Sequence, residues 1–131
     1  MAANTSPIFT LTPVTACVAI ATANANRDGT GTIGTVLTAG ANGTRIHRIN
    51  LKATVTTTAG TIRLYIYTGA AYFLWREITN VAITVSATVP AWEYVIELFG
   101  ESALVLPTGY SLRASTEKAE NHNVVAEGGD Y

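Results

Sequence analysis

The sequence predicts an all-β protein: a single antiparallel β-sandwich of about nine short strands, without substantial helix, for which a jelly roll is one arrangement. Three observations lead to this class. Apolar and polar residues alternate with a period of two along most of the chain, and Gly, Pro or Asn turns recur about every 8 to 12 residues. Thr, Val, Ile and Tyr, which suit a pleated and half-buried surface, are frequent. No stretch of about 11 residues shows the i, i+3, i+4 pattern of a capped helix.

Length and composition indicate one domain. The 131 residues suffice for a single core, so we assign residues 1–131 to one sandwich with a short N-terminal arm, about residues 1–10. Charged residues make up 13%, against about 25% in ordinary domains. A net charge of −1 argues against nucleic-acid and membrane partners. Because Cys17 is the one cysteine, no intrachain disulfide framework can form, and we expect a soluble protein of a reducing interior.

The first two strands are predicted at residues 14–22 and 33–39. Asp-Gly and Asn-Gly turns at 28–29 and 42–43 bracket the second of them. Between these turns, Gly29, Gly31 and Gly34 match the spacing G-x-G-x-x-G of a dinucleotide-binding loop. That motif must open a helix and be followed about 20 residues later by an acidic residue, and this chain offers neither. The match therefore predicts turns and no nucleotide site.

The next two strands are predicted from "RIHRINLKATVT" at 45–56 and "TIRLYIYT" at 61–68. Odd positions of the first, from His47 to Val55, face the core, and the even positions face water. Since "TTAG" is a loop of hairpin length, we expect the two strands to pair as a hairpin. In the second strand three side chains are predicted to point outward: Arg63, Tyr65 and Tyr67.

The second half of the chain continues the same alternation. Strands are predicted at 71–79, 81–87 and 91–99, then on both sides of a Pro-Thr-Gly turn at 107–109, and finally at 124–126 before a Gly-Gly break.

No group of residues has the spacing of a catalytic or metal site. His47 and His122 have no second ligand at a suitable distance, and we expect His47 to lie in the core or near an edge. Cys17 is expected to be a small buried hydrophobe. Glu93 and Glu97 lie about 13 Å apart on a strand, more than the roughly 5 to 9.5 Å of glycosidase carboxylates. The sequence predicts no enzyme, no cofactor and no metal.

Three basic residues share an outward phase on the predicted strands: Arg48, Lys52 and Arg63. They could form a small patch for an acidic partner. They could also pair across strands with Glu77, Glu93 or Glu97, each pair contributing at most about 1 kcal/mol, and pairing is the favoured interpretation.

Outward aromatic residues are the stronger functional signal. Tyr65 and Tyr67 fall on the wet phase of their strand, and "YFLW" at 72–75 cannot turn all of its large side chains inward. Exposed aromatics on a surface with few charges are typical of protein–protein contacts. The sequence therefore predicts an assembly subunit.

Several segments together carry a family resemblance. They are "MAANTSPIFTLTP", "DGTGT", "VLTAGANGTRIHRI", "LPTGYSLRAS" and the terminal "GGDY". The whole chain resembles small virion structural proteins of tailed bacteriophages and prophages, most closely capsid decoration (cement) proteins. The resemblance implies a β-sandwich made in the host cytoplasm that binds the outer face of the capsid, often as a homotrimer, with the major capsid protein as its partner.

The candidate contacts with other subunits or the capsid follow from the exposed aromatics and the resemblance. They are Pro7, Ile8, Phe9, Asn42, Tyr65, Tyr67, Tyr72 and Trp75. The N-terminal arm and the loops at 27–32 and 40–44 are the candidate capsid-facing end.

Two other functions remain open. One is a head-fibre, neck or tail-associated module that binds a receptor or glycan, in which Tyr65, Tyr67, Tyr72 and Trp75 would form a stacking platform. The other is a small enzyme, such as a glycan hydrolase or a cupin-like oxidase. Cupin chemistry needs two or three histidines with a carboxylate around a metal, and two isolated histidines argue against it.

Overall fold

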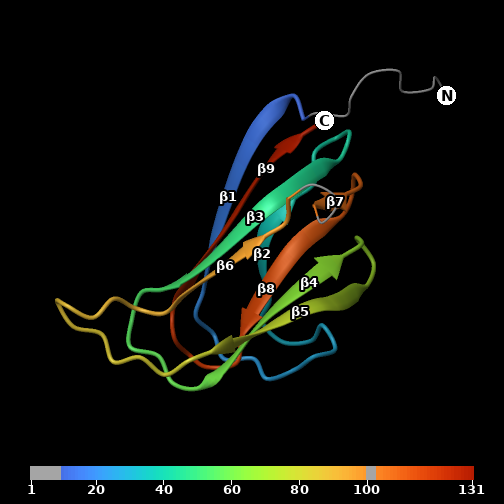
Figure 1. Ribbon diagram of the computed structural model, residues 1–131. Coiled ribbons are helices and arrows are strands. Elements are labelled where there is room, and N and C mark those ends of the chain that lie inside the picture. The colour runs from blue at the N-terminus through green and yellow to red at the C-terminus, as the bar shows by residue number, and fades with distance from the viewer. Residues whose placement is uncertain (1–9, 100–102) are drawn as a thin grey trace, which may run out of the picture.

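The computed structural model describes residues 10–99 and 103–131, which form two antiparallel sheets packed face to face (Figure 1). The described strands are β1 (Thr12–Ile20), β2 (Gly34–Thr38), β3 (Thr44–Ala53), β4 (Gly60–Tyr67), β5 (Tyr72–Asn80), β6 (Glu93–Glu97), β7 (Leu104–Leu106), β8 (Ser111–Thr116) and β9 (His122–Asp130). The predicted all-β sandwich is confirmed.

The strand order identifies the sandwich as a jelly roll. One sheet has the order β1-β9-β3-β6, and the other has the order β2-β8-β4-β5. In the first sheet β7 pairs with the start of β3, at Thr44–Ile46, and β6 pairs with its later part. Pairing is nested, because β1 pairs with β9, β2 with β8, β3 with β6 and β7, and β4 with β5. This nesting is what two Greek keys produce. Consequently β3 and β4 lie in different sheets, and the predicted hairpin between them is wrong.

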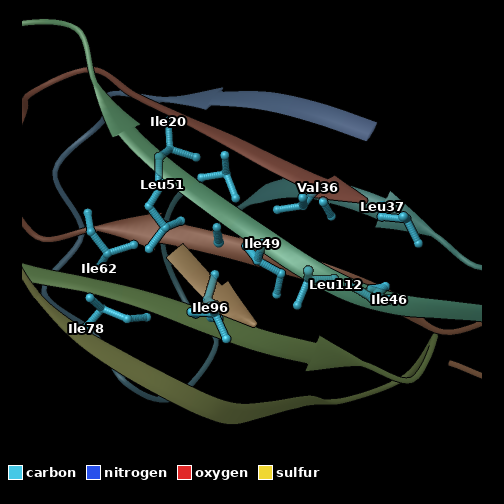
Figure 2. Close-up of a cluster of buried hydrophobic side chains, with 14 of the residues drawn as sticks. Ile20, Val36, Leu37, Ile46, Ile49, Leu51, Ile62, Ile78, Ile96 and Leu112 are labelled. Carbon is cyan, nitrogen blue, oxygen red and sulfur yellow. The ribbon is translucent and has the colours of Figure 1, made fainter. Parts of the chain in front are cut away.

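The core lies between the sheets and is built from the alternating apolar positions (Figure 2). On β3, Ile49 and Leu51 are fully buried while the residues between and beside them are half-buried. Leu112 on β8 meets them from the other sheet. Each such side chain contributes about 1.5 to 3 kcal/mol on burial, so the period of two in the sequence directly supplies the core.

Residues 81–87 do not form the predicted strand. An isolated bridge between Thr57 and Ile83 joins them to the loop between β3 and β4, and a tight turn follows in which the backbones of Ser86 and Val89 hydrogen-bond to each other. The segment alternates like a strand, but it connects one sheet to the other and extends beyond the end of the sandwich. A strand needs a neighbouring ladder, and here the neighbour is a single loop residue.

The Gly-Gly pair does not end the last strand, which continues through Gly128 and Gly129 to Asp130. A β-bulge in β3 between Ile46 and Arg48 lies opposite Gly128. A Cβ at Gly128 would lie 1.8 Å from the carbonyl oxygen of Arg45. The glycine therefore permits a close backbone approach, where the sequence pattern predicted a break.

Candidate interaction surface

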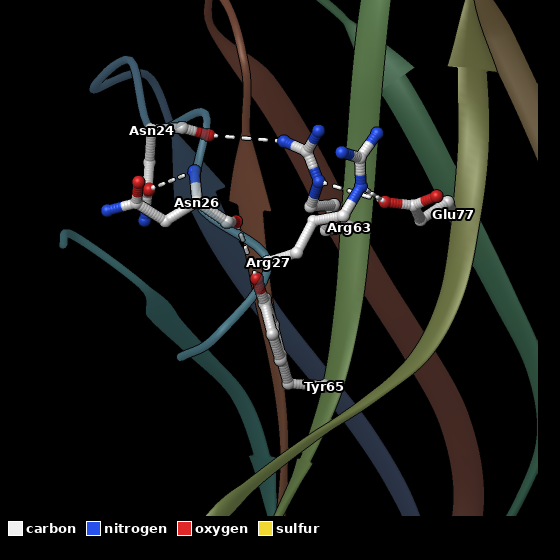
Figure 3. Close-up of polar contacts among 6 residues, drawn as sticks. All are labelled: Asn24, Asn26, Arg27, Arg63, Tyr65 and Glu77. Carbon is white, nitrogen blue, oxygen red and sulfur yellow. Dashed lines mark hydrogen bonds and ion pairs between the residues drawn. The ribbon is translucent and has the colours of Figure 1, made fainter. Parts of the chain in front are cut away.

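The two outer faces of the sandwich are covered differently. Over the four-stranded sheet lies the β1–β2 connection, residues 21–33, which contains the predicted Asp-Gly turn with Gly29 at φ +86° (Figure 3). The hydroxyl of Tyr65 donates to the carbonyl oxygen of Asn26 at 2.8 Å, and Nη1 of Arg63 donates to that of Asn24 at 3.3 Å. Tyr65 is completely buried, so its predicted outward exposure is wrong. The side chain of Tyr65 points away from the core, as the alternation predicts, but residues 21–33 cover it.

An ion-pair cluster fastens this loop to the sheet. Glu77 on β5 accepts hydrogen bonds from Nε of Arg27 in the loop and from Nε of Arg63, the latter at 3.1 Å. The bond from Arg27 is the largest cause that lowers the pKa of Glu77, and the same contact raises the pKa of Arg27. The predicted pairing of Arg63 with Glu77 is confirmed. The alternative, a basic patch with Arg48 and Lys52, does not form, because Arg63 is buried in the other sheet.

The other two tyrosines predicted as contacts, Tyr67 and Tyr72, form a cluster with an arginine that was not among the predicted contacts. The rings of Tyr67 and Tyr72 lie 4.4 Å apart, and the guanidinium of Arg113 lies 4.3 Å from the centre of the Tyr67 ring. Arg113 also donates to the hydroxyl of Tyr72 at 3.1 Å. The guanidinium thus occupies the face on which a sugar would stack.

The other predicted contact residues are dispersed. Trp75 is half-buried against the core, with the guanidinium of Arg76 5.6 Å from its ring. Asn42 is exposed in the turn between β2 and β3. Pro7, Ile8 and Phe9 lie outside the described residues. The loops at 27–32 and 40–44 contact different parts of the sandwich, since Gly29 lies against Tyr72 of β5 and Gly40 against Asp130 of β9.

The outer face of the five-stranded sheet is not covered by any segment in residues 10–99 and 103–131. Because core residues alternate with outward ones, the ladder partners define three outward rows that cross β1, β9, β3 and β6 in turn. We call these twelve residues the open face. The rows are Ala19–Asn123–Lys52–Glu93, Cys17–Val125–Asn50–Val95 and Thr15–Glu127–Arg48–Glu97.

The central row of the open face is small and mostly apolar. Cys17, expected to be buried, is exposed, because its phase on β1 points away from the core. Together with Val125, Ala19 and Asn123 it lines a shallow hollow of about 370 Å³. Exposed apolar patches of this kind are typical of contacts with another protein.

The outer rows of the open face carry the charges. Arg48 lies between Glu97 on β6 and Glu127 on β9, and Lys52 lies opposite Glu93, so the predicted partners are neighbours in the ladder, although the predicted ion pairs between them are not formed. Within the described chain neither Glu93 nor Glu97 closes an ion pair, and Nζ of Lys52 donates instead to the carbonyl oxygen of Ala91 at 2.8 Å. Two buried atoms of this face, Nε of Arg48 and Oδ1 of Asn50, have no hydrogen-bond partner among the described residues.

A second distinctive surface is one end of the sandwich, where residues 54–59 and 81–91 project (Figure 1). We call this surface the uncharged end, because neither segment contains Asp, Glu, Lys, Arg or His. Val55, Val81 and Val89 are 41%, 53% and 43% exposed there. Thr58 of this end donates from its backbone nitrogen to the carboxylate of Glu120 at 3.0 Å, which holds the loop on the sandwich.

The histidines do not form a site. His122 is fully buried, and its burial lowers the pKa of the imidazole. His47 sits at the bulge of β3, half-buried, and stacks on Phe99 at 5.9 Å. Among residues 10–99 and 103–131 no three His, Cys, Asp or Glu side chains gather closely enough to bind a metal ion. The same part of the chain contains no helix of the length and apolarity that a membrane span requires.

A scan against protein-family models finds no match to this chain, and a search of curated proteins finds none either.

Proposed function

We propose that this protein is a structural subunit of a tailed-phage virion that binds the outer surface of the assembled capsid and stabilises it. The observation that carries the proposal is the uncharged end. An end of the molecule that projects, contains no charge in two loops and exposes three valines is better suited to contact with protein than with water. The resemblance of the sequence supplies the partner, the major capsid protein.

The mechanism is clamping by mass action. Each subunit would bridge neighbouring capsid proteins, so that its binding free energy opposes rupture of the shell. The uncharged end replaces the loops at 27–32 and 40–44 as the candidate contact, because those loops lie apart from each other and 27–32 contacts the sheet beside it. The proposal includes neither a nucleic-acid nor a membrane partner.

A homotrimer is part of the same proposal. The resemblance implies it, and β5 offers a contact surface, because it is the edge strand of the four-stranded sheet and exposes Phe73 and Leu74 to 59% and 39%. An exposed apolar edge strand invites pairing with another chain. Contact along β5 would remove it from water.

The alternative is a head-fibre, neck or tail-associated module that binds a receptor or glycan. The Tyr67–Tyr72 pair gives this alternative little support, because the guanidinium of Arg113 already stacks on the ring of Tyr67, where a sugar would bind. The two functions differ in copy number, because decoration follows the capsid lattice and tail modules do not.

Mass spectrometry of gradient-purified virions tests the proposal by the ratio of this protein to the major capsid protein. We expect a ratio of the order set by the capsid lattice. A ratio of only a few copies per particle would indicate that the protein belongs to the neck, tail or fibre. Absence from the particle would refute a virion role altogether.

A further inference from the structure

We propose that the open face pairs two copies of the chain around a two-fold axis that runs parallel to its strands. Among the described residues, Nε of Arg48 is buried and has no hydrogen-bond partner, although Glu97 and Glu127 flank Arg48 on the two neighbouring strands. A buried donor without a partner costs about 1 to 3 kcal/mol. A second copy that presents a carboxylate would give the guanidinium group of Arg48 the partner that its own chain does not supply.

The register of the face shows how a second copy can do so. The axis lies between β9 and β3 and runs parallel to the strands. A half-turn about it places β3 of one copy over β9 of the other, and β1 over β6. Each row of one copy then faces the same row of the other copy. Arg48 of each copy then faces Glu127 of the other. In the central row, Cys17 of one copy faces Val95 of the other. In the row that contains Arg48, Thr15 of one copy faces Glu97 of the other.

The other in-plane axis is disfavoured by charge. Rotation about an axis across the strands, along the central row, exchanges the two outer rows. Arg48 would then face Lys52 of the second copy, and Glu97 would face Glu93. Opposed like charges at an interface cost several kcal/mol. The charge pattern therefore selects the axis parallel to the strands.

The size of the face suits a weak contact between subunits. It spans four strands about 4.8 Å apart and five residues along each strand, the full length of β6, so it presents about 330 Å² of plane per copy. A standard interface buries about 800 Å² per partner. Two sheets that pack face to face with roughly aligned strands are a common arrangement.

The chosen axis has a consequence for assembly. Because the strands of both copies run the same way, both uncharged ends point in the same direction. Two paired copies could therefore stand side by side on one surface. The pairing itself follows from the sheet and does not depend on what that surface is.

Cys17 is a natural reporter of this contact, because it is the single cysteine and lies exposed in the central row. We would measure its rate of reaction with a chromogenic disulfide reagent while raising the concentration of the wild-type protein from about 1 µM to about 1 mM, a range that brackets weak contacts. The rate constant should fall at least tenfold as the pairs form. A rate constant that stays the same over this range, whether fast or slow, would overturn the proposal.

Charge reversal provides the second test and separates contacts between copies from contacts within one chain. Arg48→Glu alone places two glutamates against each other in a pair, and Glu127→Arg alone places two arginines against each other. Mixing the two variants restores opposite charges between copies, while each chain keeps its internal repulsion. We expect light scattering to show a rise in mass on mixing and none when either is mixed with Lys118→Glu, a matched charge reversal in the β8–β9 connection. An unchanged mass on mixing the two folded variants contradicts the proposed axis.

Discussion

Nδ2 of Asn80 donates a hydrogen bond of 3.1 Å to Nε2 of His122, and this bond joins the two sheets through the interior of the sandwich. Nδ1 of His122 lies 2.9 Å from the carbonyl oxygen of Glu120, which can only accept, so Nδ1 carries the proton. Both side chains are at most 1% exposed. The neutral imidazole is therefore built into the contact between the sheets, and the ring packs edge-on against Trp92 at 5.7 Å.

This arrangement predicts a loss of stability in mild acid. Burial lowers the pKa of His122 below its ordinary value of 6.5, so the unfolded chain takes up a proton below pH 6.5 while the folded chain does not. The free energy of unfolding should fall by up to about 1.4 kcal/mol per pH unit as the pH drops from 6.5 towards the lowered value. Thermal unfolding between pH 8 and pH 5 measures it. The slope should flatten in His122→Gln and persist in His47→Gln; equal slopes in all three proteins would contradict the assignment.

Gly128 should be intolerant of any side chain. Because a Cβ there would overlap the carbonyl oxygen of Arg45, Gly128→Ala must displace the bulge of β3 and should cost about 3 kcal/mol. Gly60→Ala is the matched control, since its nearest neighbour is the flexible side chain of Lys118 at 3.0 Å. Urea unfolding would compare the two variants. Similar midpoints for both would show that the close approach is not rigid.

Removing the carboxylate of Glu77 should loosen the loop over the four-stranded sheet. Glu77→Gln leaves the buried guanidinium of Arg63 with a weaker acceptor, and we expect a loss of about 2 kcal/mol. Arg27→Ala should have a smaller effect than Glu77→Gln, because the side chain of Arg27 is 63% exposed and solvent screens its ion pair. Hydrogen exchange of the amides of residues 24–30 should accelerate in Glu77→Gln. Protection equal to the wild type would mean that backbone contacts alone hold the loop.

A charge at the uncharged end should weaken binding to the proposed capsid partner. Val81→Asp places a carboxylate where the side chain is 53% exposed, so folding should be unaffected. Its desolvation in the contact should reduce binding at least tenfold, about 1.4 kcal/mol. Co-sedimentation with capsids that lack this protein measures the change, with Thr108→Asp at the opposite end as control. Unchanged binding by Val81→Asp would place the capsid contact elsewhere.

The edge strand β5 should control the proposed trimer. Phe73→Asp introduces a charge at an exposed edge position and should remove the trimer, so that the mass in solution falls to that of one chain of 13.8 kDa, or of two chains where the open faces pair. Light scattering at micromolar concentration measures it, with the exposed turn variant Asn42→Asp as control. A wild-type mass of 13.8 kDa would argue against a trimer in solution.

The class of fold and most of the strands could be predicted because they depend on local alternation. Ile49 and Leu51 face the core as expected, and Gly43 and Gly109 adopt the positive φ angles, 92° and 87°, of the predicted turns. The sheet to which each strand belongs could not be predicted. "TTAG" has the length of a hairpin loop, yet the chain crosses there to the other sheet.

The surface could be predicted less well than the core. Alternation shows which side of a strand a residue takes, so Tyr65 and Cys17 share the same outward phase. Tertiary structure buried Tyr65 under residues 21–33 and left Cys17 exposed. The sequence by itself determined the class of fold, most of the strands and the turns, because each depends on neighbouring residues. The pairing of distant strands, the covered face and the open face were decided only when segments far apart in the chain came together, because which segments meet depends on packing over the whole molecule.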